Sequence, residues 1–195
     1  LSQTPSFILH KAASDDTYAW NSWHMGLSTD YYIALNATSA QDNSVNIWPT
    51  AGITDSVITT ASSTVKYNNL SGETHIAYIW HDVPGLQKFG SYGGADAFVE
   101  LGFRPAVLII KSLSDSRNWI IIDSARDTFN PSDRALLPND TSVEDDNSVY
   151  AIDFLSNGFK IRGGNGQIDG DTTYIYAAWA EAPSTGLYGA QSTAR

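Results

Sequence analysis

The chain has 195 residues, of which 42% are hydrophobic, 12% are aromatic and 16% are charged, a composition that supports a folded core and not a disordered chain. Its 11 basic and 21 acidic residues give a formal net charge of −10, which argues against nucleic acid and against an anionic membrane surface as partners. The absence of cysteine excludes disulfides and thiolate chemistry. No apolar run approaches the roughly 18 residues that a membrane span requires.

Short strands separated by turn residues are predicted along the whole chain. In the first half, apolar and alternating runs predict strands over residues 7–11, 18–23, 31–35, 44–48, 56–60, 64–67 and 75–80. In the second half, they predict strands over residues 106–111, 119–123, 135–137, 149–154, 159–162 and 174–180. No segment carries an apolar stripe of helical period and length, so the pattern predicts an all-β fold with antiparallel sheets.

Two local patterns refine this expectation. The turn Ser156-Asn157-Gly158 between two apolar runs is the strongest hairpin signal in the chain. Residues 107–110 and 120–122 are apolar at every position, which predicts central strands covered on both faces.

The second half of the sequence repeats the first. Four matches occur in the same order, with an offset that drifts by only a few residues: residues 5–11 with 105–111, Trp20 with Trp119, residues 43–45 with 147–149, and residues 74–80 with 173–179. We therefore predict two tandem repeats of an antiparallel β-sandwich unit of jelly-roll or concanavalin-like type.

The repeat also predicts the domain boundaries. Residues 1–84 are expected to form the first repeat, 85–183 the second, and 184–195 a C-terminal tail. The first repeat has no counterpart of residues 89–100, so the chain is expected to begin inside a repeat and to continue upstream of Leu1.

The sequence carries no motif of a known catalytic centre. The G-x-S-x-G, G-x-G-x-x-G and Walker patterns are all missing, and we expect no enzyme, no catalytic residue and no cofactor. No metal site is predicted either, because His75 and His81 lie roughly 20 Å apart on one extended strand. Ca²⁺ near Asp140, Glu144, Asp145 and Asp146 is left open, as are glycosidase carboxylates, which pair in space and not in sequence.

Aromatic residues provide the candidate binding site. Trp20 with Trp119, and Trp80 with Trp179, occupy matched positions and are expected in the core. Four residues have no aromatic or histidine counterpart in the other half, and we predict that they form a sugar-stacking surface: Trp23, His24, Tyr31 and Trp48. The alternative is that they pack in the core or at an interface between copies.

Several phrases of the second half carry a family resemblance. They are residues 102–106, 123–127, 130–131, 153–160 and 174–181. Together they resemble a duplicated module near the C-termini of fibre and appendage proteins of tailed phages, including marine cyanophages, where it often follows a concanavalin-like lectin domain. The likeness is close through the second half and looser through the first, where residues 48–67 depart most. Residues 192–195 resemble the ends of those chains, so we expect the natural C-terminus there.

The resemblance implies a virion protein, assembled in the host cytoplasm and placed in a tail or capsid appendage. We expect a fibre module that binds other virion proteins and a host-surface glycan, and that does not insert into a membrane. We also expect it to associate with itself, as a homotrimer in preference to a dimer, since several weak sites acting together give avidity. The alternatives are a capsid or tail decoration protein with a purely structural role, and a polysaccharide depolymerase.

Overall fold

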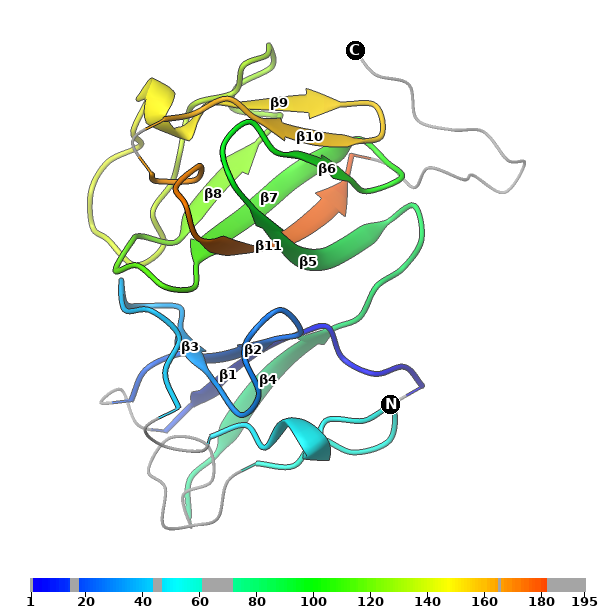
Figure 1. Cartoon of the computed structure of the whole chain (residues 1–195). Helices are drawn as coiled ribbons and strands as arrows, with labels where there is room; N and C mark the ends of the chain where they lie inside the picture. Colours follow the sequence, from blue (N-terminus) through cyan, green and yellow to red (C-terminus); the bar gives the residue numbers. More distant parts are fainter. Residues whose placement is uncertain (1, 15–17, 44–46, 61–71, 165, 182–195) are drawn as a thin grey trace.

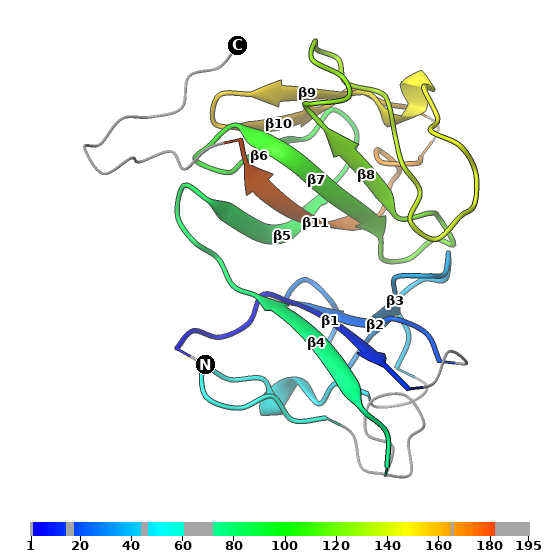
Figure 2. The same cartoon turned by 180° about the vertical axis from the view of Figure 1, so that it is seen from behind.

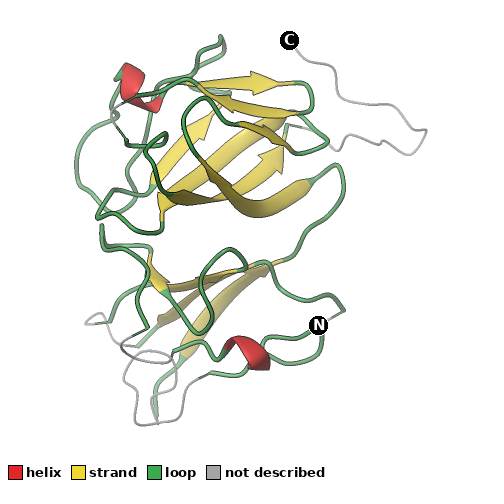
Figure 3. Ribbon diagram, viewed as in Figure 1, coloured by secondary structure: helices red, strands yellow, loops and turns green. Residues whose placement is uncertain are grey.

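Strands joined by loops make up the fold, which we describe from a computed structural model (Figures 1 and 3). The structure describes residues 2–14, 18–43, 47–60, 72–164 and 166–181. The strands are β1 (Phe7–Ala12), β2 (Asn21–His24), β3 (Ile33–Ala34), β4 (His75–Trp80), β5 (Gln87–Gly93), β6 (Phe98–Glu100), β7 (Pro105–Ser112), β8 (Ile120–Asp123), β9 (Ile152–Leu155), β10 (Gly158–Ile161) and β11 (Thr173–Ala180). The short 3-10 helices η1 (Thr50–Gly52) and η2 (Ser148–Tyr150) interrupt them, and within the described ranges no helix is long and apolar enough to cross a membrane.

The strands form three sheets in which neighbours run antiparallel, so the predicted all-β, antiparallel class is confirmed. A four-stranded sheet has the order β3-β2-β1-β4, a second has the order β5-β11-β7-β8, and a three-stranded sheet has the order β6-β10-β9. We call these the lower, middle and upper sheets, after their places in Figure 1.

Many of the predicted strands are present. The strand predicted over residues 75–80 has those bounds in the structure, and the strands predicted at 7–11, 106–111, 119–123, 159–162 and 174–180 shift by one or two residues. The predicted hairpin is formed by β9 and β10, with Leu155 opposite Gly158 across a two-residue loop. Gly158 is required there, because a Cβ would lie 2.0 Å from the carbonyl oxygen of Val99 on β6.

Other predictions were wrong. Residues 149–154 were expected to be one strand, but the Asn147 side chain accepts a hydrogen bond from the amide of Val149 and starts η2, so β9 begins only at Ile152. The strand at 31–35 shortens to β3 and that at 18–23 starts later, at Asn21. Around residues 56–60 and 135–137, only isolated bridges form.

Some of the predicted segments lie outside the residues that the structure describes. The strand at 64–67 and the tail at 184–195 lie outside the described residues, as does the first part of the strand at 44–48. Strand β5 was missed because Gln87–Gly93 contains glycine and polar residues in place of an apolar run, and β6 was missed because it has only three residues. Apolar β7 is central and covered on both faces as predicted, whereas β8 lies at the edge of the middle sheet.

The lower and middle sheets contain the same three-strand arrangement. β1 pairs with β2 and β4, and β7 pairs with β8 and β11. The register also agrees, since Phe7 lies opposite Trp80 on β4 and Val107 lies opposite Trp179 on β11. The sheets differ beyond this shared arrangement, because β5 pairs with the outer edge of β11 and no described strand pairs with the outer edge of β4.

These two sheets stack face to face and share an apolar core, which we call the inter-sheet core. Its buried members come from both halves of the chain: Phe7, Ile33, Phe89, Leu113, Trp119, Ile175 and Ala177. The matched residues Trp80 and Trp179 meet at its border, edge to face, with ring centroids 6.1 Å apart. Gly26 is also part of this contact, because a Cβ there would lie 2.9 Å from Cγ2 of Ile175.

Hydrogen bonds from buried side chains also join the two sheets. The indole N–H of Trp119 donates to the carbonyl oxygen of Ala34 over 2.9 Å. The ammonium of fully buried Lys111 donates to the carbonyl oxygens of Ser112 and Thr38. Burial lowers the pKa of Lys111 to about 8, although the charge of Asp115 acts in the opposite direction. The contact between the sheets is therefore both apolar and specifically hydrogen bonded.

The outer faces of the two sheets are covered differently. The middle sheet packs on the upper sheet around a large second core that includes Leu108, Phe159 and Tyr176, so the second half forms a two-sheet sandwich. The lower sheet is covered by the segment around η1, which contributes Ile47, Trp48 and Ile53 (Figures 1 and 2). The expectation of one sandwich per repeat therefore differs from the described structure, in which one sandwich and one further sheet share a core.

The inter-sheet core predicts that the two halves unfold together. Phe89 is 2% exposed and contacts Phe7, His24 and Trp179, so Phe89→Ala should lower the free energy of unfolding by about 3–5 kcal/mol while leaving one cooperative transition. The matched control is Phe98→Ala on β6, where the ring is 48% exposed and the expected loss is below about 1 kcal/mol. Denaturant unfolding followed by circular dichroism measures both. Two separate transitions, of which Phe89→Ala shifts only one, would contradict the shared core.

Candidate functional site

A row of three aromatic side chains lies on the lower sheet, where β4 forms its edge. Trp20 stacks on Tyr78 with ring centroids 6.4 Å apart and an interplanar angle of 23°, and Tyr78 stacks on Trp80 at 6.2 Å and 22°. We call these three residues the aromatic row. Tyr78 is 46% exposed and the other two are half-buried, so solvent reaches the row.

The strand geometry explains why the row forms. Tyr78 and Trp80 are two residues apart on β4 and therefore point to the same face. Trp80 also stacks on Phe7 of the neighbouring strand at 5.4 Å, which anchors one end of the row in the inter-sheet core. Trp20 immediately precedes β2, and its amide donates to the side-chain oxygen of Asn36 over 3.0 Å. The row is thus anchored at both ends and open at its middle.

A small cavity of about 200 Å³ lies in the connection that follows β4. It is lined by Asp82, Val83, Pro84, Gln87, Lys88 and Leu101. Its polar groups already have internal partners: the Asp82 carboxylate accepts from the Phe89 amide, and the Lys88 ammonium donates to the Glu100 carbonyl oxygen. The polar side chains that line the cavity therefore already bond within the protein, which leaves few groups to bind a ligand.

The predicted sugar-stacking surface is not formed by the residues proposed for it. Trp23 and Trp48 are 6% and 1% exposed and belong to the core beneath the lower sheet, while His24 is 1% exposed between the sheets. Tyr31 is half-buried. The prediction was wrong for the three buried residues, because their rings already pack against protein and offer no face to a sugar.

One signal in the sequence would have identified the aromatic row. Tyr78 occupies the position that matches Ala177 in the second half, so it is also an aromatic residue without an aromatic counterpart. Trp20 and Trp80 were assigned to the core because tryptophans match them in the other half. The structure places Trp119 in the core but leaves Trp20 half-buried, so matched residues need not be equally buried.

His24 contributes to the contact between the sheets. Its Nδ1 accepts the amide of Gly26 over 3.0 Å, so Nε2 carries the proton and donates to the carbonyl oxygen of Tyr176, also over 3.0 Å. Burial lowers the pKa of His24 to about 4, against a smaller opposite effect of the hydrogen bond to Tyr176. The side chain is therefore neutral at physiological pH, and it hydrogen bonds to backbone groups on both sides of the contact between the sheets.

Two other histidines lie next to each other beneath the lower sheet. The rings of His10 on β1 and His75 on β4 stack with centroids 5.0 Å apart, and His10 also meets the ring of Trp48 edge to face. Stacked rings direct their nitrogens alongside one another and do not converge on one ion. Within the described residues, no group of three or more His, Asp or Glu side chains is placed to hold a metal ion.

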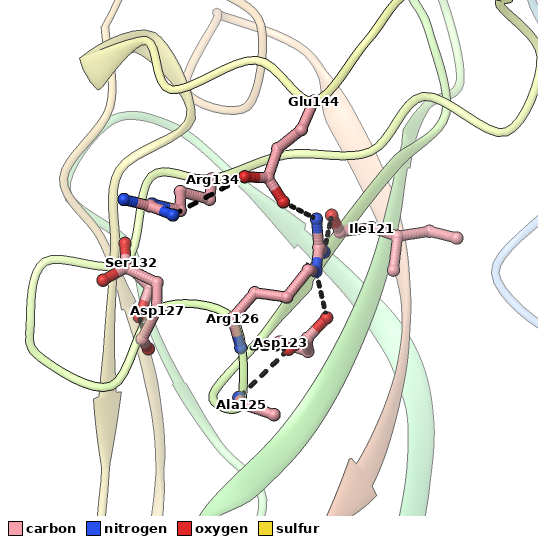
Figure 4. Close-up of polar contacts among 8 residues, drawn as sticks. All are labelled: Ile121, Asp123, Ala125, Arg126, Asp127, Ser132, Arg134 and Glu144. Carbon is pink, nitrogen blue, oxygen red and sulfur yellow. Dashed lines mark hydrogen bonds and ion pairs between the residues drawn. The ribbon is translucent and has the colours of Figure 1, made fainter.

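One of the acidic residues considered for Ca²⁺, Glu144, forms ion pairs with two arginines (Figure 4). Glu144 accepts a hydrogen bond from Arg126 over 2.8 Å and lies 3.7 Å from Arg134. Arg126 also donates to the Asp123 carboxylate over 2.6 Å. Partial burial opposes ionisation of Asp123, but the hydrogen bonds and charge of Arg126 prevail and lower its pKa. This ion-pair network fastens the loop around Glu144 to the end of β8.

The pKa of His24 predicts a loss of stability in acid. The unfolded chain binds the proton with a pKa near 6.5 and the folded chain only near 4, so the unfolded state binds more protons between these values. As the pH falls from 6.5 to 4, His24 should therefore cost about 3 kcal/mol of unfolding free energy. Comparing wild type with His24→Gln by denaturant unfolding at several pH values isolates this effect from the carboxylates.

The variant His81→Gln is the control, and it should retain the acid-induced loss. An identical pH dependence of wild type and His24→Gln would show that His24 is not buried as a neutral ring.

The ion-pair network predicts unequal effects of two similar substitutions. Arg126→Lys removes the planar group that joins Asp123 to Glu144 and should cost about 1–2 kcal/mol of unfolding free energy. Arg134→Lys should cost below about 0.5 kcal/mol, because this side chain is 51% exposed and makes only the longer contact. Thermal unfolding of the two variants measures the difference, and equal losses would contradict the assigned network.

Comparison with known proteins identifies a family but no characterised relative. Neither a curated protein nor a solved structure matches the chain. One family model does match, over residues 1–183, and it is described as a domain of unknown function, DUF7483. Because this match covers nearly the whole chain, the protein belongs to the DUF7483 family.

Proposed function

We propose that this chain is a virion appendage module of a tailed phage that contacts a host-surface glycan through the aromatic row. The observation that carries the proposal is the solvent-accessible stack of Trp20, Tyr78 and Trp80. A pyranose ring presents a C–H face, and the faces and edges of aromatic rings are suitable partners for it. The virion location rests on the resemblance of the second half to fibre and appendage proteins.

The composition is consistent with a surface-exposed binding module. Only 16% of residues are charged, and the net charge of −10 disfavours polyanionic ligands, which leaves neutral sugars as the better match. Two or three stacked rings bind a sugar weakly, so useful attachment requires several sites acting together. We therefore propose that the chain works as a homo-oligomer alongside other virion proteins, without catalytic activity.

We also propose that the chain consists of two tandem copies of one unit, residues 1–84 and 85–183. The support is the shared pairing of β1 with β2 and β4, and of β7 with β8 and β11, in matching register. In this proposal the matched faces of the two copies pack on each other. Contact between the matched residues Trp80 and Trp179 agrees with such an arrangement, since a two-fold interface brings equivalent residues together.

A second candidate is a capsid or tail decoration protein that only mediates assembly. It is favoured by the exposed apolar side chains of Ile76 and Ile79 at the edge of the lower sheet, which is a surface suited to another protein chain. The two candidates differ in whether isolated protein binds host cells.

Binding of the purified chain to host cells and to arrays of envelope glycans tests the proposal. Trp20→Ala and Tyr78→Ala should each reduce binding at least tenfold, because each removes a ring from the row. Phe129→Ala is the control, since Phe129 is an 82% exposed aromatic residue in the other half of the chain and its loss should leave binding unchanged.

Three results would contradict the proposal. Equal binding by all variants would show that the aromatic row is not the glycan-binding site. If the wild type binds neither host cells nor glycans, the decoration protein is favoured. Release of reducing ends from host polysaccharide would instead indicate a depolymerase.

A further inference from the structure

One buried arginine has a hydrogen-bond donor without an acceptor. Arg104 immediately precedes β7 and is 5% exposed, and its Nη1 donates to the Glu181 carboxylate over 2.8 Å. Its Nε is buried and has no hydrogen-bond partner, and the guanidinium makes no other hydrogen bond within the described residues. A buried donor without an acceptor costs free energy, so it calls for a physical explanation.

A cavity of about 360 Å³ lies against this arginine. It is lined by Arg104 and by three residues of the loop that follows β8, Thr128, Phe129 and Asn130. Ligand pockets typically have volumes of roughly 300–1,000 Å³, so there is room for a side chain or a small molecule. The Asn130 side chain accepts from the amide of Phe154 on β9 and donates to its carbonyl oxygen, over 2.9 and 3.0 Å. The loop wall of the cavity is therefore fastened to the upper sheet.

Another arginine of this chain shows which group fits the free side of Arg104. Nε of Arg126 donates to Asp123 over 2.6 Å while its Nη1 donates to Glu144 over 2.8 Å (Figure 4). One guanidinium thus joins two carboxylates in this protein. At Arg104, Nη1 pairs with Glu181 in the same way, but Nε has no carboxylate beside it. The comparison indicates a second carboxylate as the missing partner.

The free donors of Arg104 have the geometry that a carboxylate requires. The N–H of Nε and one N–H of Nη2 point in the same direction and form a fork that binds both carboxylate oxygens. Because Glu181 already balances the charge of Arg104, the site suits a single negative charge and disfavours a phosphate dianion. The sequence after Glu181 contains no Asp or Glu, so the following segment has no acidic side chain to place there.

The ring of Phe129 indicates that the carboxylate belongs to another protein chain. Phe129 is 82% exposed, against 48% for Phe98 and 46% for Tyr78. Arginine and aromatic residues are enriched in the central parts of protein interfaces, whereas a small-molecule site encloses most of its ligand. An exposed ring beside a buried arginine follows the interface pattern.

We propose that this cavity binds an aspartate or glutamate side chain of another protein chain. The carboxylate accepts hydrogen bonds from Nε and Nη2 of Arg104, and apolar groups next to it pack on the ring of Phe129. The contact supplies the missing acceptor and covers the exposed ring. It lies in the second half of the chain, uses no residue of the aromatic row and does not depend on glycan binding.

Capped dipeptides test whether the cavity binds a carboxylate side chain. Acetyl-Glu-Leu-amide should shift the NMR signal of the Arg104 Nε–H in the whole chain, because this donor gains an acceptor. The neutral isostere acetyl-Gln-Leu-amide should bind at least tenfold more weakly. A single contact of this size binds weakly, so the titrations extend to millimolar concentrations. Glucuronate, titrated in parallel, should bind more weakly than the Glu dipeptide, because it offers no apolar group to Phe129.

Substitutions test whether Arg104 and Phe129 form the site. Arg104→Lys keeps a positive charge beside Glu181 but removes the fork, so it should weaken binding of the Glu dipeptide at least tenfold. Arg134→Lys is the control, because it removes a guanidinium that does not line the cavity, and it should bind as the wild type does. Phe129→Ala should weaken dipeptide binding severalfold while leaving glycan binding unchanged, which separates this site from the aromatic row.

The proposal fails if the wild type binds the Glu and Gln dipeptides equally or binds neither. It also fails if a folded Arg104→Lys variant binds the Glu dipeptide as the wild type does. Tighter binding of glucuronate than of the Glu dipeptide would assign the cavity to a sugar acid and overturn the assignment to a protein side chain. The two dipeptides are compared on the wild type, so this test holds even if Arg104→Lys does not fold.

Discussion

The contact between the lower and middle sheets is the interaction on which the rest of the structure depends. A four-stranded sheet with apolar side chains on both faces needs two covers, and each of these sheets supplies one cover for the other. Phe7 and Phe89 occupy the centre of this contact, while Trp119 and His24 add hydrogen bonds from buried side chains to backbone of the opposite sheet. A buried polar side chain with a fixed partner favours one alignment of the sheets over others.

This contact also determines which surfaces remain available for function. The middle sheet is covered on its other face by β6, β9 and β10, and β5 is its edge strand beside β11. The lower sheet has a smaller cover, and β4 at its edge has no described neighbour beyond β1. The aromatic row lies there. The surface with the proposed glycan-binding function thus occurs where the two similar sheets differ.

The sequence predicted the class of the fold and many of its strands, because apolar runs and turn residues are local signals. It predicted β4 to the residue and the hairpin around Asn157. It did not predict β5, in which Gly90 leaves room for the Tyr176 ring, a contact formed by chain segments far apart in sequence. The candidate site failed for a related reason: the lower sheet is covered by loops in place of a sheet, so Trp23 and Trp48 are needed to fill its core. Burial of that kind depends on tertiary packing and leaves no periodic signal in the sequence.

Native-state hydrogen exchange measures the central claim, that the two sheets form one cooperative unit, most directly. Amides in β1 and β7 are the most informative, because these two strands hold matching inner positions in their sheets and donate to both neighbours. If the inter-sheet core joins the two halves, these amides will exchange with the same free energy of opening, equal to that of global unfolding. Exchange of β1 at a free energy several kcal/mol below that of β7 would contradict the account, because the lower sheet would then open while the middle sheet stayed folded.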